Sequence, residues 1–238
     1  MPDRARIAVA SALAGYNLLQ NLALPAPAYV PANLLAAAGL VALGRRYGCT
    51  WNELGLDPSR VRPGLRLGLI GAAGAMAAAL ATIGNRSTGR LLLDERAADQ
   101  AGRDVVFRAL VRFPLGTALF EEVAFRGVLS GMWLRAGASA RRASGVTALA
   151  FALWHLIPTR DALSGNPLDS RFTTPAAKAG VVATGALLTG ISSFGLSWMR
   201  ERSGSLVAPW MTHAAINSVG YLAGVAAWRR ANATAGAG

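Results

Sequence analysis

Apolar residues in this chain are gathered into long runs, and short polar stretches rich in arginine separate the runs. A run of about 20 apolar residues is long enough to cross the hydrocarbon core of a bilayer as a helix. The pattern predicts about seven such helices, within a range of six to eight, at residues 6–24, 28–44, 67–83, 114–135, 144–157, 176–199 and 205–228. We therefore expect an all-α, polytopic transmembrane helix bundle.

Two of these predictions leave alternatives open. Residues 6–24 follow basic residues and resemble either a first membrane helix or a signal peptide, and we favour an uncleaved helix because the run is long and further spans follow. Residues 104–113 alternate apolar residues with Arg108 and Arg112, so we place them at the membrane interface, or else they lengthen the fourth span. In the first case Pro114 begins that span, where its missing N–H costs nothing.

The polar connections divide the chain into parts. Tyr47 to Arg66 is expected to lie outside the hydrocarbon, the fifth apolar segment is expected to end at Pro158, and a loop is expected from Thr159 to Pro175. In the third segment, Gly68, Gly71 and Gly74 favour close packing between helices. We expect N-terminal spans with their connecting loops, including the polar stretch Arg86 to Arg103, over residues 1–103, a second group of spans over 104–230, and a disordered tail over 231–238.

The composition supports a membrane protein and excludes several other classes. Apolar residues make up 53% and charged residues only 15%, which is too apolar for an ordinary soluble domain. The net charge is +12, but the arginines lie between apolar runs rather than along one face with interleaved aromatic residues. This distribution indicates contact with anionic lipid headgroups and not nucleic acid.

Other aspects of the composition bear on topology and source. Alternate sets of loops carry nearly equal numbers of basic residues, so orientation in the membrane stays undecided. The single cysteine, Cys49, excludes an internal disulfide. Abundant alanine, glycine and arginine, with Lys178 as the sole lysine, favours a GC-rich bacterial genome and hence a bacterial plasma membrane.

Three charged residues lie inside the fourth apolar run: Glu121, Glu122 and Arg126. Each charge at the centre of a membrane helix costs roughly 2.5–3.5 kcal/mol on insertion scales, so each requires a partner or a function. Residues four apart share a helix face, so Glu122 and Arg126 are expected to pair. Glu121 points about 100° away and needs another polar partner.

The chain has only two histidines, and both fall inside apolar segments. Phe151 lies one turn before His155, and Asn217 lies one turn after His213. With alternating spans, Glu121 is about 10 Å, His155 about 5 Å and Asn217 about 16 Å from the same membrane face, at 1.5 Å per residue. A lone intramembrane histidine is more often a core residue with its hydrogen bonds satisfied. Two of them beside an unpaired glutamate favour a functional site.

The motifs Glu-Glu-x-x-x-Arg, Phe-x-x-x-His and His-x-x-x-Asn occur in this order on successive apolar segments. In this they resemble the CPBP family of intramembrane proteases, which includes the type II CAAX prenyl endopeptidases and the bacterial Abi-type proteins. The resemblance covers residues 104–228 and implies that 104–230 is an intramembrane protease core. The first 100 residues are similar only in being membrane-spanning.

The resemblance implies a role for each residue of the motifs. Glu121 would act as general base on a water with help from His155, and His213 with Asn217 would stabilise the oxyanion. Three further residues, Glu122, Arg126 and Phe151, would support the site. The implied activity is hydrolysis of a peptide bond in a membrane-associated peptide or membrane-anchored protein.

Three alternatives stay open or fare worse. The set Glu121, His155 and His213 is also able to ligate zinc, as in a metalloprotease, but no His-Glu-x-x-His motif is present and we favour the metal-free mechanism. No aspartate lies within a clear apolar span, which disfavours an aspartyl protease. The alternative from another class is a non-proteolytic membrane protein, serving bacteriocin self-immunity or transport, in which the polar cluster only fastens helices.

Overall fold

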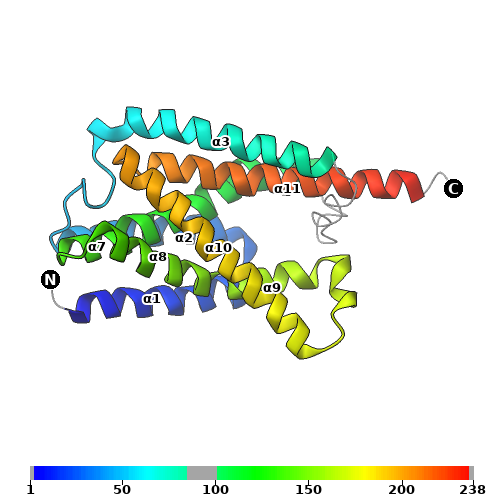
Figure 1. Ribbon diagram of the computed structural model, residues 1–238, viewed down its shortest axis with the longest axis horizontal. Coiled ribbons are helices and arrows are strands. Elements are labelled where there is room, and N and C mark those ends of the chain that lie inside the picture. Colours follow the sequence, from blue (N-terminus) through cyan, green and yellow to red (C-terminus); the bar gives the residue numbers. More distant parts are fainter. Residues whose placement is uncertain (1–2, 85–100, 236–238) are drawn as a thin grey trace.

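The computed structural model describes residues 3–84 and 101–235. Within these ranges every regular element is a helix, and no strand occurs. The long helices are shown in Figure 1; they are α1 (Asp3–Leu22), α2 (Tyr29–Arg46), α3 (Val61–Gly84), an unbroken helical segment from Gly102 to Arg135, α8 (Ala140–Trp154), α10 (Pro175–Ser203) and α11 (Val207–Ala235). Short helical turns are η1 (Ala26–Ala28), η2 (Pro58–Arg60) and η7 (Pro167–Arg171).

The helical segment from Gly102 to Arg135 is not a uniform α-helix. It consists of α5 (Gly102–Phe107), the π-helix η5 (Arg108–Ala118), α6 (Leu119–Glu122), the π-helix η6 (Val123–Leu129) and α7 (Ser130–Arg135). A π-helix closes its hydrogen bonds five residues apart instead of four, and such turns are frequent at functional sites. The short α6 between the two π-helices carries both glutamates.

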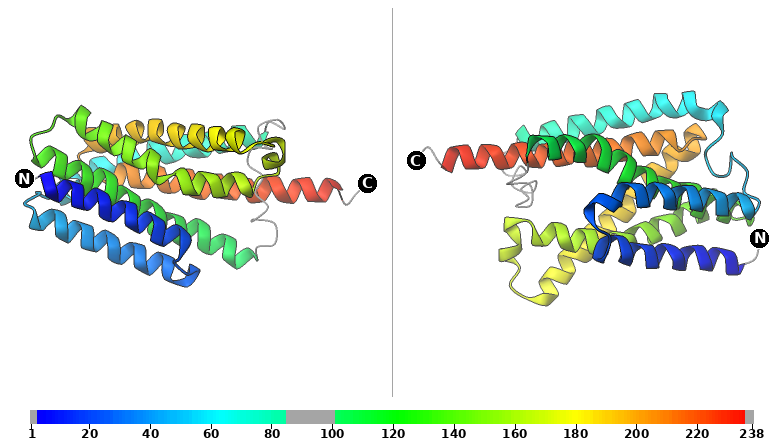
Figure 2. Two further views of the ribbon diagram at one scale, coloured as in Figure 1. Left: turned by 90° about the horizontal axis from the view of Figure 1, so that it is seen from below. Right: turned by 180° about the vertical axis from the view of Figure 1, so that it is seen from behind.

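The central helical segment forms the core of the bundle. Every residue of η6 is buried, and the aromatic rings of Phe120 and Phe125 pack against Trp154. The helices α2 and α11 contact η5, while α3 packs along α11. Figures 1 and 2 show α1 beside α2 and α8, and α10 crossing the bundle obliquely.

The outer surface is apolar, as expected for a membrane protein. Within residues 3–84 and 101–235, three helical stretches meet the length and hydropathy expected of a membrane span: Ala26–Arg46, Pro58–Gly84 and Pro175–Ser203. Large apolar side chains on α3 and α10 point outward, among them Ile70, Leu187 and Leu188. This arrangement confirms the prediction of an all-α transmembrane bundle.

Close helix packing occurs where the glycines of α3 face α11. A Cβ added to Gly68 would lie 3.0 Å from Met211, and one added to Gly71 would lie 2.0 Å from the Thr212 hydroxyl. Gly74 has open space instead. Two of the three glycines singled out in this segment therefore permit the contact between α3 and α11.

Pro114 lies inside the helical segment, so the prediction that it begins the fourth span is wrong. Residues 104–113 lengthen that helix, in line with the alternative left open above. A proline inside a helix removes one N–H donor, and the wider π spacing of η5 accommodates it. The Pro114 carbonyl accepts hydrogen bonds from the Leu119 amide and, at 2.8 Å, from the Trp210 indole on α11.

The fifth helix ends at Trp154 rather than at Pro158. A second helix, α9 (Leu156–Ser164), starts two residues later and holds Pro158 in its first turn, where a missing N–H is tolerated. The expected loop from Thr159 to Pro175 is thus partly helical. The break between α8 and α9 places His155 at the junction.

The connection between α2 and α3 lies at one end of the bundle and packs onto it. Cys49 and Leu54 are fully buried there, and the Gly55 carbonyl accepts a hydrogen bond of 2.8 Å from the Leu206 amide. Of the second polar connection, residues 85–100 lie outside the described residues. At the other end, α11 continues to Ala235, within the segment expected to be a tail; residues 236–238 also lie outside the described residues.

Candidate active site

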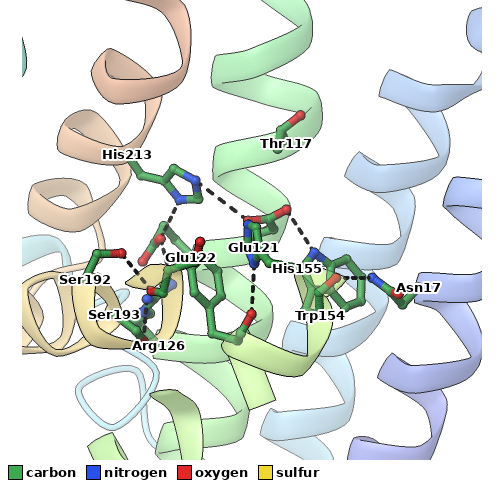
Figure 3. A network of polar contacts seen from close by, with 12 residues as sticks. Asn17, Thr117, Glu121, Glu122, Arg126, Trp154, His155, Ser192, Ser193 and His213 are labelled. Atoms are coloured by element: carbon green, nitrogen blue, oxygen red, sulfur yellow. Dashed lines mark hydrogen bonds and ion pairs between the residues drawn. The ribbon is translucent and has the colours of Figure 1, made fainter. Parts of the chain in front are cut away.

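The two glutamates predicted to be intramembrane are buried at the centre of the bundle. Glu121 is 4% exposed and Glu122 is fully buried. They lie 14 and 13 residues before Arg135, so the helix places them about 20 Å from that end. A buried carboxylate requires charge compensation and hydrogen bonds, and the two glutamates obtain these from different neighbours (Figure 3).

Glu122 is the carboxylate at the centre of a buried ionic network. The Arg126 guanidinium lies 3.0 Å away, which is the pair that the helix spacing predicts. Arg126 is 1% exposed and donates a second hydrogen bond of 2.6 Å to the Ser193 hydroxyl on α10. The same oxygen of Glu122 also lies 2.8 Å from His213 Nδ1 on α11. Glu122 therefore joins the central helical segment to α11, and Arg126 joins it to α10.

Glu121 has one oxygen that is held and one that is not. Its Oε1 accepts a hydrogen bond of 3.0 Å from the Trp154 indole. Its Oε2 is buried and has no hydrogen-bond partner among the described residues. Two imidazole nitrogens face this oxygen, His155 Nε2 at 3.8 Å and His213 Nε2 at 3.7 Å. Both distances exceed hydrogen-bond range, so a third group is needed to connect these atoms.

The surroundings of the two histidines fix which ring nitrogen carries a proton. His155 Nδ1 lies 2.8 Å from the Phe151 carbonyl, which only accepts, so Nδ1–H donates and a neutral ring presents a lone pair at Nε2. His213 Nδ1–H donates to the Glu122 carboxylate by the same reasoning. In both residues, Nε2 is directed toward Glu121.

The aromatic ring of Phe151 packs against several residues of the site. The Arg126 guanidinium lies 4.1 Å from the ring centroid, in cation–π geometry, and the His155 ring centroid lies 4.3 Å away. The His213 ring meets it edge-on at 5.9 Å, so the Phe151 ring contacts the ion-pair network and both histidines that face Glu121.

The structure also brings in residues that sequence reasoning missed. Asn17 on α1 donates a hydrogen bond of 3.0 Å to the Trp154 carbonyl, at the end of α8. Trp154 in turn holds Glu121. The signal for Asn17 was present, because it is a buried amide within an apolar run, but only the fold shows its partner. Ser193 was missed for the same reason.

Asn217 is the one predicted site residue without a contact in this network. It lies one turn beyond His213 on α11 and is half-buried. Its side chain makes no hydrogen bond to the described residues. The structure thus brings together Glu121, His155 and His213. Asn217 lies near them only in the sense that it is one turn from His213 on α11.

The site offers donors that suit zinc, namely one carboxylate oxygen and two imidazole nitrogens. The hydrogen bond from each Nδ1 to an acceptor is also the arrangement that orients metal-binding histidines. The described residues nonetheless contain no group of three or more such side chains in an arrangement that could hold a metal ion. The chemistry of the donors therefore fits zinc, while their present spacing does not.

Comparison with known proteins finds a family model that matches the segment of the chain in which most of these residues lie. Residues 104–219 match the family model described as type II CAAX prenyl endopeptidase Rce1-like. No curated protein and no solved structure matches the chain. The matched segment includes both glutamates, Arg126, both histidines and Asn217. Over residues 104–219, just under half of the chain, the sequence is therefore similar to the type II CAAX prenyl endopeptidases of the Rce1-like family.

Proposed function

We propose that this chain is an intramembrane endopeptidase in which Glu121 activates a water molecule for attack on a peptide bond. The family match over residues 104–219 supports a membrane protease of the CAAX-protease-like kind in general. The observation that carries the finer proposal is the free Oε2 of Glu121, which is buried and faced by two histidine nitrogens.

In the proposed reaction, a water occupies the space between Glu121 Oε2 and His155 Nε2. It donates one hydrogen bond to each, so its oxygen lone pairs are free for the substrate carbonyl carbon. Glu121 takes the proton as the C–O bond forms, and later passes it to the leaving amine as the C–N bond breaks. The Trp154 hydrogen bond keeps the carboxylate turned so that Oε2, and not Oε1, faces the water.

His213 is proposed to stabilise the oxyanion that forms on the carbonyl oxygen. Glu121, Glu122 and Arg126 together carry one net negative charge, and a protonated His213 would neutralise it. In that form Nε2–H is a donor, and Glu122 holds the ring through Nδ1. Asn217 is proposed as a second donor from the next turn of α11.

The proposed substrate is a peptide or membrane-anchored protein that reaches the site from the bilayer.

Cleavage of membrane-reconstituted peptides by the purified protein tests the proposal. Glu121→Gln keeps an oxygen that accepts from Trp154 but removes the base, so we expect kcat to fall by about 10²–10⁴-fold with an unchanged melting temperature. Glu122→Gln is the matched control, because the same change one residue away should lower the melting temperature. Undiminished cleavage by Glu121→Gln would refute the role of Glu121, and equal melting losses in both variants would favour a cluster that only fastens helices.

A further inference from the structure

A long groove runs along α1, on the side where this helix faces α7 and α8. It consists of two cavities of about 510 and 410 Å³, which share the lining residues Ala10, Leu129 and Ala150. Its lining extends along α1 from Asp3 to Leu18, which is about 22 Å at 1.5 Å per residue. Figure 2 shows α1 lying against the outside of the bundle along this length.

The inner part of the groove is apolar and opens outward. Apart from Asn17, which is engaged with Trp154, its lining consists of apolar side chains. Two of them, Leu18 and Leu153, are more than half exposed, at 54% and 58%. In a membrane this surface faces lipid tails and not water, so the groove is accessible from the bilayer.

The outer end of the groove is cationic. Arg6 and Arg142 both lie over the indole ring of Trp133, at 4.3 and 5.3 Å from the ring centroid. Both arginines line the outer cavity, together with one carboxylate, Asp3, which pairs with Arg6. Positive charge is therefore in excess here. Tryptophan and arginine at the end of a membrane helix are typical of the headgroup region.

From this combination we propose that the groove between α1 and α8 binds one anionic phospholipid of the surrounding bilayer. The headgroup phosphate would lie at Arg6 and Arg142, and one acyl chain would extend along α1 toward Trp154. The length is suitable, because about 15 Å of hydrocarbon, half the core thickness, lies in each leaflet. The groove covers that depth and also the headgroup region.

The charge pattern selects this occupant over a zwitterionic lipid. A basic residue near the surface contributes about 1 kcal/mol to binding of an anionic lipid, which corresponds to about fivefold in affinity. The apolar inner part of the groove is suited to an acyl chain. A soluble phosphate compound would contact only the cationic outer end. The proposal is independent of the catalytic roles assigned above.

Native mass spectrometry of the full chain in detergent tests the proposal by titration with dioleoyl-phosphatidylglycerol or dioleoyl-phosphatidylcholine. We expect phosphatidylglycerol to bind at least about fivefold more tightly. Glycerol phosphate, which has the anionic group without the chains, should show no retained adduct.

Three variants locate the site. Arg142→Gln should weaken binding of phosphatidylglycerol by about fivefold without affecting phosphatidylcholine. Ala10→Phe, at an exposed position that lines both cavities, should weaken both lipids. Arg141→Gln is the matched control, since Arg141 is exposed at the same end but does not line the groove. Equal affinity for the two lipids, or equal losses in Arg141→Gln and Arg142→Gln, would overturn the proposal, as would retention of glycerol phosphate.

Discussion

His213 and Glu122 lie 91 residues apart in the chain, and His213 Nδ1 is 2.8 Å from the same Glu122 oxygen that pairs with Arg126. Glu122 thus has two partners, one on its own helix and one on α11. Its carboxylate both compensates a buried guanidinium and sets the orientation of the imidazole that faces Glu121. Glu122 therefore contributes both to the stability of the bundle and to the geometry of the site.

The first prediction concerns the buried pair of Glu122 and Arg126. Glu122→Gln leaves a buried guanidinium without its counter-charge, and such single losses cost about 3–5 kcal/mol. We expect a loss of this size in reversible unfolding measured in detergent. The double variant Glu122→Gln/Arg126→Met removes both charges and should recover at least half of the loss. If the loss of stability in the double variant equals the sum of the losses in Glu122→Gln and in Arg126→Met, the ion pair has no coupling energy.

The second prediction concerns Trp154 as a positioning residue. Trp154→Phe keeps an aromatic ring against Phe120 and Phe125 but removes the donor to Glu121 Oε1. Hydrogen bonds to charged groups contribute about 1.5–3 kcal/mol, so we expect kcat to fall about tenfold or more. Because the indole is not proposed to touch substrate, KM should stay constant. Steady-state kinetics separate the two constants, and a change confined to KM would contradict this role.

The third prediction concerns metal dependence. If Glu121 activates water directly, treatment with a strong chelator such as 1,10-phenanthroline should leave cleavage unchanged. Elemental analysis of the purified protein should then find less than one zinc ion per chain. A loss of activity that zinc restores would reassign Glu121, His155 and His213 as ligands.

The fourth prediction concerns Cys49, in the connection between α2 and α3. Burial raises the pKa of its thiol, so the thiol stays protonated at neutral pH. Since the thiolate is the reactive form, we expect Cys49 to resist maleimide at pH 7.5 in the folded protein and to react in dodecyl sulfate. The variant Cys49→Ser/Ala176→Cys, with its cysteine at an exposed position of α10, serves as the control and should react in both conditions.

The raised pKa of Cys49 also has a consequence for stability. The folded value lies above the unfolded value of about 8.5, so the contribution of the neutral thiol is complete below that pH. It is lost as the pH rises through the folded pKa. Unfolding of the wild-type chain and of Cys49→Ser, compared between pH 7 and 10, should show a steeper decline for the wild type. Parallel curves would contradict the assignment.

Much of the fold could be predicted because hydrophobic runs of membrane length are a strong signal. The Glu122–Arg126 pair followed from helix spacing alone. The proximity of Glu121 to both histidines could be predicted because a buried carboxylate needs polar neighbours and the chain has only two histidines, both within apolar segments.

Other features depend on contacts between distant segments and carry little local signal. The Pro114 carbonyl in the π-helix η5 accepts a hydrogen bond from the Trp210 indole, 96 residues away. The break at His155 occurs before the proline that was expected to cause it, because a proline in the first turn of a new helix is tolerated. Asn17 could not be predicted as part of the site because its partner is a backbone carbonyl at the end of α8, and the sequence pattern does not indicate which backbone groups accept hydrogen bonds from distant side chains.

The two π-helices on either side of α6 make the length of the central helical segment as important as its composition. Deleting one residue from a π-helical turn converts its five-residue hydrogen-bond spacing into the four-residue spacing of an α-helix. The helix that follows the deletion is then rotated about its axis by about 100°. A deletion within η5 would therefore turn Glu121 and Glu122 out of phase with the part of the helix that α2 and α11 hold. We expect η5 to tolerate substitutions more readily than any change in its number of residues.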